Sequence, residues 1–155
     1  MAVFAASQAL DMAVKLEENG EAFYRAAAET RSENELQELF EDLAGRERSH
    51  RQVFERMAAE VEEAPEPPPA EVGDYASFLE VALNHAVFSG PDKALSIAEE
   101  AEDRTAVLRA AMGFEKDTLL FYYDLREMVG EKDRDVVSDI IREEKQHLQR
   151  LAKQV

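Results

Sequence analysis

The chain contains two Glu-x-x-His pairs, Glu47 with His50 and Glu144 with His147. Side chains three or four positions apart lie on one face of a helix, so the members of each pair point the same way. Both pairs fall in helical stripes that are otherwise apolar. Carboxylates are rarely buried unless they are paired or bind a metal. Glutamate oxygens and histidine nitrogens suit iron, manganese or zinc, so the pairs predict metal ligands inside a helical protein.

Two further glutamates, Glu17 and Glu115, lie in similar apolar stripes. Four helices would therefore each direct one Glu inward, and two of these helices would add a His one turn later. Di-iron carboxylate bundles use this set, with one Glu from each of two helices and Glu-x-x-His from each of the other two. The predicted metal ligands are Glu17, Glu47, His50, Glu115, Glu144 and His147.

A simpler interpretation is that these residues lie on helix surfaces. A single Glu-x-x-His occurs often on a surface helix. An isolated Glu that is counted in an apolar stripe often lies on the solvent-facing side of its helix instead. Here the stripes, the four helices and an internal repeat all agree. Without metal, the six groups would form a buried cluster of like charges, whereas four carboxylates neutralise two divalent cations. We therefore favour a two-metal site.

The two halves of the chain resemble each other. The segment LEENGEAFY at residues 16–24 aligns with FEKDTLLFY at residues 114–122. Each segment places a Glu seven residues before a tyrosine, Tyr24 or Tyr122. An internal duplication explains the match and predicts a pseudo-twofold bundle in which equivalent residues face one another.

Proline positions divide the chain into two helical hairpins. All five prolines lie between Pro65 and Pro91, and both flanks are rich in good helix formers. We predict a single all-α domain over residues 1–155, an up-down-down-up four-helix bundle with one additional short helix. The predicted helices span residues 3–30, 33–62, 75–88, 103–129 and 132–153, with a proline-rich linker at 63–73 and a connecting segment at 92–101.

Composition narrows the classes of partner. The 18 Lys+Arg and 34 Asp+Glu give a formal net charge of −16, which would repel nucleic acids and anionic membranes. The absence of cysteine excludes disulfides, zinc–thiolate sites and iron–sulfur clusters. No stretch resembles a signal peptide or approaches the roughly 20 apolar residues of a membrane span. We expect a soluble cytoplasmic protein.

Taken together, the motifs resemble the rubrerythrin-like branch of the ferritin-like superfamily. The resemblance covers both hairpins outside residues 63–102 and implies a ferritin-like four-helix bundle that binds two iron ions, with manganese or zinc as alternatives. The matching motifs are Glu17-x6-Tyr24, Glu47-x2-His50, Glu115-x6-Tyr122 and Glu144-x2-His147.

The resemblance also implies roles for these residues. The implied bridging carboxylates are Glu47 and Glu144, the implied terminal carboxylates are Glu17 and Glu115, and His50 and His147 each close one iron. Family members use the tyrosines as hydrogen-bond donors to the ligand carboxylates. From the residues alone, Tyr24 and Tyr122 are interpreted equally well as amphipathic core residues.

The chain departs from true rubrerythrins in two respects. Those enzymes carry a rubredoxin module whose four cysteines deliver electrons, and this chain has no cysteine. They also have an additional Glu one turn after the third-helix ligand, where this chain has Thr118. The remaining symmetrical site resembles the ferroxidase centres of ferritins and bacterioferritins.

The resemblance implies a di-iron oxidoreductase of the peroxidase or ferroxidase type, which oxidises ferrous iron with reduction of hydrogen peroxide or dioxygen in oxidative-stress defence. Repeated turnover would need an external electron donor such as a rubredoxin. One alternative is an iron storage or delivery protein within a larger assembly, and another is a non-catalytic metal-binding bundle or sensor. We expect a homodimer or higher homo-oligomer.

Four other residues are assigned to less specific roles. Glu18, Glu21 and Glu143 neighbour the predicted ligands but fall off the stripes, so they are predicted to lie on the surface. His85 lacks an acidic partner at ligand spacing and is predicted to pack in the protein or face solvent.

Overall fold

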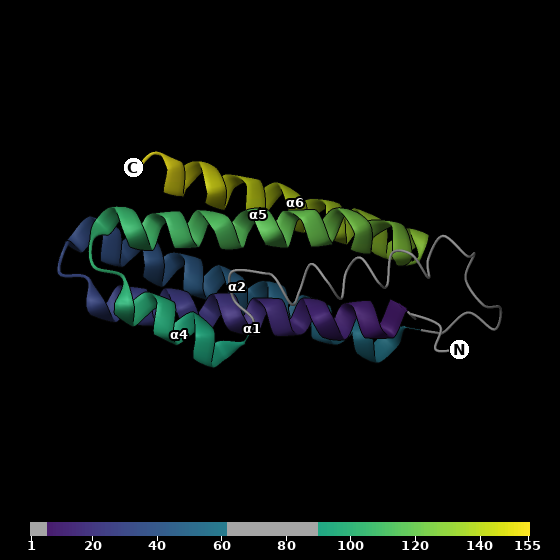
Figure 1. Ribbon diagram of the computed structural model, residues 1–155. Helices are drawn as coiled ribbons and strands as arrows, with labels where there is room; N and C mark the ends of the chain where they lie inside the picture. Colours follow the sequence, from purple (N-terminus) through teal and green to yellow (C-terminus); the bar gives the residue numbers. More distant parts are fainter. Residues whose placement is uncertain (1–5, 62–89) are drawn as a thin grey trace.

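The protein is all-helical over the part of the chain that the computed structural model describes, residues 6–61 and 90–155 (Figure 1). The predicted helix at 75–88, the linker at 63–73 and His85 lie outside these residues. No helix of the described part is long and apolar enough to cross a membrane. The helices are α1 (Ala6–Thr30), α2 (Asn34–Glu60), α4 (Pro91–Glu100), α5 (Arg104–Met128) and α6 (Glu131–Ala152).

The four long helices form two antiparallel hairpins, α1 with α2 and α5 with α6, which pack against each other mainly through α1 and α5 (Figure 1). Helices α2 and α5 run in the same direction, so the order is up-down-down-up. The predicted all-α ferritin-like bundle is therefore confirmed. This topology brings the middle of every long helix to the same level.

Residues 91–100 form helix α4, where the sequence pattern predicts only a connecting segment. Pro91 occupies the first turn of α4. A proline is favourable at that position because the first helical N–H groups have no partner within the helix. Ala94 and Ala98 are fully buried, and α4 lies along α1 (Figure 1).

Polar side chains join the two hairpins at one end of the bundle. Arg31 donates from Nη2 to the carbonyl oxygen of Ala101 at 2.8 Å, which links the α1–α2 turn to the end of α4, just before α5. Arg104 donates from Nη2 to Oε1 of Gln154 at 2.7 Å and also pairs with Glu33. These contacts fix how the hairpins meet and thus the position of the helix centres.

The apolar core consists of two clusters separated along the bundle axis. One cluster includes Phe23, Phe40, Leu43, Leu108 and Phe114. The other includes Leu10, Phe54, Phe121, Leu125 and Ile140. On every long helix the predicted ligands lie between the members of one cluster and the members of the other, so a polar layer divides the core in two.

Replacing Leu108 with Ala should destabilise the protein by about 2–5 kcal/mol, because Leu108 is fully buried and its loss leaves a cavity. Leu120, on the same helix but 52% exposed, is the matched control and should change the free energy of unfolding by no more than about 0.5 kcal/mol on the same substitution. Urea denaturation measures both values. Equal effects would show that the cluster containing Leu108 is not packed as described.

Candidate metal centre

The structure brings all six predicted ligands together in the polar layer. Glu17, Glu47, Glu115 and Glu144 have no solvent exposure, and His50 and His147 are each 3% exposed. Each long helix contributes one Glu, and α2 and α6 each add a His one turn later, as helical geometry requires. The site therefore depends on four separate helices meeting at one level.

The six side chains form two overlapping groups, and in each group the ligand atoms lie within 4.8 Å of one another. Two carboxylates, Glu47 and Glu144, belong to both groups and so lie between two metal positions. Among the described residues, no other set of His, Cys, Asp or Glu gathers in this way. The groups are Glu17, Glu47, His50 and Glu144, and Glu47, Glu115, Glu144 and His147.

Both imidazoles present Nδ1 to the carboxylates. His50 Nδ1 lies 2.9 Å from Oε1 of Glu144 and 3.7 Å from Oε1 of Glu17. His147 Nδ1 lies 3.0 Å from Oε2 of Glu144 and 3.5 Å from Oε1 of Glu47. Nδ1 is therefore the nitrogen of each ring that a cation held by these carboxylates would meet.

Several carboxylate oxygens in this layer have no hydrogen-bond partner within the described part of the protein. They are Oε2 of Glu17, both oxygens of Glu47 and Oε2 of Glu115. Buried polar atoms are nearly always satisfied, and leaving them unpaired costs free energy. Divalent cations would satisfy these oxygens and neutralise four carboxylates, so the residues present fit a pair of metal ions.

Two buried tyrosines hold the outer carboxylates from the opposite hairpin. Tyr24 donates from its hydroxyl to Oε1 of Glu115 at 2.5 Å, and Tyr122 donates to Oε1 of Glu17. In each case the other oxygen of the carboxylate is the unpartnered one. The tyrosines thus orient one oxygen of each terminal glutamate toward the space between the helices, which a purely apolar role would not require.

Electrostatics of the metal-free cluster favours bound protons. Burial raises the pKa of Glu17 and Glu115 well above the usual range, and the charges of Glu47 and Glu144 raise it further. Burial also raises the pKa of Glu47. Although burial acts in the opposite direction, hydrogen bonds from His147 and His50 hold the pKa of Glu144 well below its usual range.

The histidines show the complementary effect. Burial alone lowers the pKa of an imidazole, but the carboxylate of Glu144 raises the pKa of His50 to about 8. Glu115 and Glu144 likewise raise the pKa of His147 to about 12 against the effect of burial. At neutral pH both imidazoles are therefore in the cationic form, with a proton on each ring nitrogen. A metal ion must displace the proton on Nδ1 to bind there.

Of the three glutamates predicted to lie on the surface, one is buried and another reaches the cluster from the surface. Glu21 is buried rather than on the surface, because it bonds Arg51 Nη1 at 2.6 Å and Arg25 Nη2 at 2.7 Å. Glu143 is partly exposed, but its Oε2 lies 2.7 Å from Nε2 of His50. Glu18 is exposed as predicted. Glu21 is buried by its arginine partners, one of which lies on another helix. The spacing of apolar residues along one helix does not reveal such a contact.

The residues one turn after the α1 and α5 glutamates differ. Thr118 is fully buried, and its hydroxyl has no hydrogen-bond partner among the described residues. Its counterpart Gly20 leaves no room for a side chain, because a Cβ there would lie 2.6 Å from Cζ of Phe114 and 2.7 Å from Oε2 of Glu47. Gly20 thus permits the close approach of α1 to a shared carboxylate.

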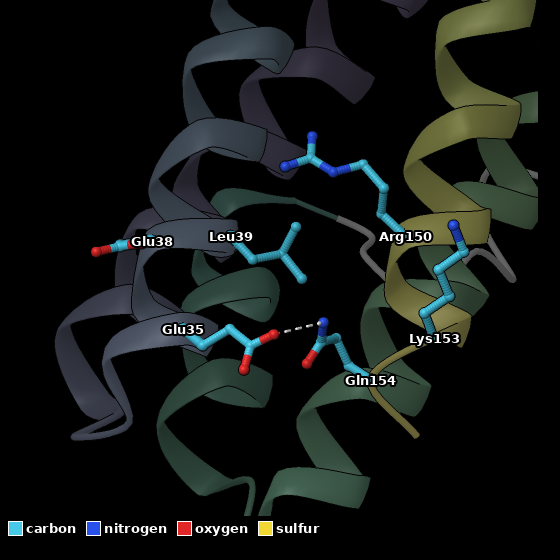
Figure 2. Close-up of a pocket in the computed structure, with 6 residues that line it drawn as sticks. All are labelled: Glu35, Glu38, Leu39, Arg150, Lys153 and Gln154. Carbon is cyan, nitrogen blue, oxygen red and sulfur yellow. Dashed lines mark hydrogen bonds between the residues drawn. The ribbon is translucent and has the colours of Figure 1, made fainter.

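A separate surface pocket of about 290 Å³ lies between the start of α2 and the end of α6 (Figure 2). Figure 2 shows Glu35 and Gln154 facing each other across it, with 3.5 Å between Oε1 of Glu35 and Nε2 of Gln154. The pocket contains none of the six clustered residues. From Glu35 to Glu47 the helix rises by roughly 18 Å, so this pocket is not an opening to the cluster.

Comparison with known proteins agrees with this geometry. The family model described as Rubrerythrin matches residues 8–155. A crystal structure from Thermotoga maritima, described as a ferritin-like diiron-carboxylate protein, matches with a TM-score of 0.73 and 26% sequence identity. That match covers 99% of this chain and 95% of the other chain. The curated proteins contain no match to the sequence.

Replacing Gly20 with Ala should lower the affinity for divalent metal about 10-fold, because the added methyl group displaces Phe114 or Glu47. Gly45→Ala is the matched control, since a Cβ at Gly45 meets nothing within 4 Å. That control should stabilise the protein by about 0.5–1 kcal/mol and leave metal binding unchanged. Calorimetric titration with manganous ion measures the affinities, and equal affinity in both variants would contradict the described packing.

Metal binding should release protons, and its affinity should rise with pH. The raised pKa values of Glu17, Glu115 and His147 mean that the metal-free cluster holds protons that the metal-bound cluster does not. Raising the pH removes these protons and therefore favours binding. Calorimetric titrations in buffers of different ionisation enthalpy measure the number of protons released. An affinity that is constant between about pH 6 and about pH 8 would contradict this electrostatic description.

Proposed function

The chain belongs to the rubrerythrin family, and on that premise we propose that it binds two iron ions and oxidises ferrous iron with reduction of hydrogen peroxide or dioxygen. The observation that carries this proposal is the pair of buried ligand groups sharing Glu47 and Glu144. Shared carboxylates hold two cations close enough to act together on one small oxidant. Manganese or zinc would use the same ligands, and iron is proposed because the matching crystal structure is described as a diiron-carboxylate protein.

Each residue of the cluster has a proposed part. The tyrosine hydroxyls of Tyr24 and Tyr122 fix the terminal carboxylates, and the two apolar clusters exclude bulk water from both sides of the layer. The resulting site is rigid and dry, which strengthens electrostatic interactions inside it. The ligands divide into two bridging carboxylates, Glu47 and Glu144, and two terminal pairs, Glu17 with His50 and Glu115 with His147.

A bound iron pair would supply two electrons, one from each ferrous ion, which together with two protons reduce one hydrogen peroxide to two waters. Thr118 adds no fifth carboxylate, so the donor set keeps the near-symmetry typical of ferroxidase centres. Because the chain has no cysteine, we propose that electrons for repeated turnover come from a separate donor such as a rubredoxin.

Replacing Glu17 with Ala should slow oxidation of added ferrous iron by more than about 100-fold, because it removes a proposed terminal ligand and leaves Tyr122 without its acceptor. Glu18→Ala is the matched control, because it removes the adjacent, exposed carboxylate. Stopped-flow absorbance after mixing with peroxide or oxygen measures both rates. Similar rates for the two variants would contradict the assignment.

Iron stoichiometry separates catalysis from storage. A catalytic site should take up about two irons per chain and then stop, because the described cluster has ligands for two ions. Aerobic iron loading followed by gel filtration and metal analysis measures this number. Uptake of many more irons per chain would favour storage or delivery, and metal-dependent stability without oxidant consumption would favour a non-catalytic bundle.

A further inference from the structure

The two halves of the cluster are not equivalent, and the difference lies behind the histidines. On one side, Nε2 of His50 lies 2.7 Å from Oε2 of Glu143. An ionised carboxylate only accepts hydrogen bonds, so Nε2 donates to Glu143 and keeps its proton when a cation displaces the one on Nδ1. The opposite nitrogen, Nδ1, faces Glu144 and Glu17. Glu143 therefore fixes both the ring orientation and the tautomer that a metal ligand needs.

The other histidine, His147, has no carboxylate at Nε2 among the residues that the structure describes. Within the described chain, every ion-pair contact of His147 is made by Nδ1, with Glu144, Glu47 and Glu115. Glu143 directly precedes Glu144, but the residue directly before Glu47 is Arg46, which pairs with Asp42 at 3.8 Å. At the position that the internal repeat pairs with Glu143, the chain therefore has the cation Arg46 in place of a carboxylate.

The carboxylate on that side is already used. Arg150, on the same helix as His147, donates from Nη1 to Oδ2 of Asp42 at 2.7 Å. Asp42 is therefore held by Arg150 and Arg46. Among the described residues, the only hydrogen bond of the Asp42 side chain is the one from Arg150, and none joins Asp42 to His147.

A second contact strengthens the side of the cluster that contains His50. Arg51, the next residue along α2, pairs with Glu21 at 2.6 Å and so joins α2 to α1 beside the ligands of both helices. The corresponding positions of the second hairpin are occupied by Leu148 on α6 and Leu119 on α5. Leucine side chains cannot form an ion pair, so α5 and α6 lack this link beside their ligands.

We propose that Glu143 is a positioning residue for His50, and that it makes the metal position formed by Glu17 and His50 the tighter one, filled before the position formed by Glu115 and His147. This inference rests on the proposed two-metal function and deepens it. The two positions share Glu47 and Glu144, so their difference arises from the unshared ligands and from what holds those ligands.

The effect of Glu143 should be specific to one binding step. Loss of a hydrogen-bond partner behind a metal-ligating histidine lowers metal affinity by about 10–100-fold. Glu143→Ala should therefore weaken the first step by this factor and leave the second unchanged. Glu143→Gln keeps an oxygen acceptor for Nε2 and should restore most of the affinity.

The experiment is an anaerobic calorimetric titration of the metal-free full chain with ferrous iron, in the wild type, Glu143→Ala, Glu143→Gln and Glu41→Ala. Glu41 is an exposed carboxylate on α2, so its variant is a control for the change in net charge. Anomalous diffraction from crystals loaded with one equivalent of iron identifies the position that fills first. We expect the stronger signal between Glu17 and His50, and loss of this preference in Glu143→Ala.

Three outcomes would overturn the inference while leaving the two-metal function intact. Glu143→Ala would bind ferrous iron in two steps of unchanged affinity, or it would lose affinity equally in both steps, or Glu41→Ala would lose as much affinity as Glu143→Ala. A wild-type chain that binds no pair of ferrous ions would instead overturn the proposed function, and the inference with it. Normal unfolding curves of each variant, compared before titration, show whether any loss comes from misfolding.

Discussion

Mutual repulsion of four fully buried glutamates is the constraint to which the rest of this bundle responds. Carboxylates in a medium of low polarity cannot all ionise unless positive charge lies among them. The two imidazoles supply part of it, and this is why the pKa of His147 rises to about 12 while the pKa of Glu144 falls. Several carboxylate oxygens of this layer have no hydrogen-bond partner among the described residues, so bound cations would stabilise the layer further.

The surrounding structure holds this unfavourable arrangement in place. Two apolar clusters lie on either side of the polar layer, and tyrosines from one hairpin bond glutamates of the other. Gly20 lets α1 approach Glu47, and Arg104 and Arg31 link the ends of the hairpins. The free energy that keeps the carboxylates together therefore comes from packing and hydrogen bonds outside the layer. A site assembled in this way is already formed before a ligand arrives.

The apolar periodicity of the sequence was sufficient to predict the four-helix bundle and the six residues of the Glu/His cluster. Each long helix has one continuous apolar stripe, and the residues in that stripe must face inward. Contacts across helices were a different matter. Glu143 and Glu21 fall off the stripes, and their partners His50 and Arg51 lie on other helices, so no spacing rule connects them. Helix α4 was missed because Pro91 is compatible with the end of one helix and the start of the next. The sharing of Glu47 and Glu144 follows from three-dimensional proximity that motif spacing alone does not contain.

We propose that the four buried carboxylates hold two divalent cations. Differential scanning calorimetry of metal-free protein, with increasing ferrous or manganous ion, tests it most directly, since cations that bind only the folded state raise its melting temperature. We expect a large rise in Tm that levels off at about two ions per chain and is abolished when Glu47 and Glu144 are replaced by Gln. A Tm that does not change with metal, or that rises equally in the doubly substituted protein, would contradict it.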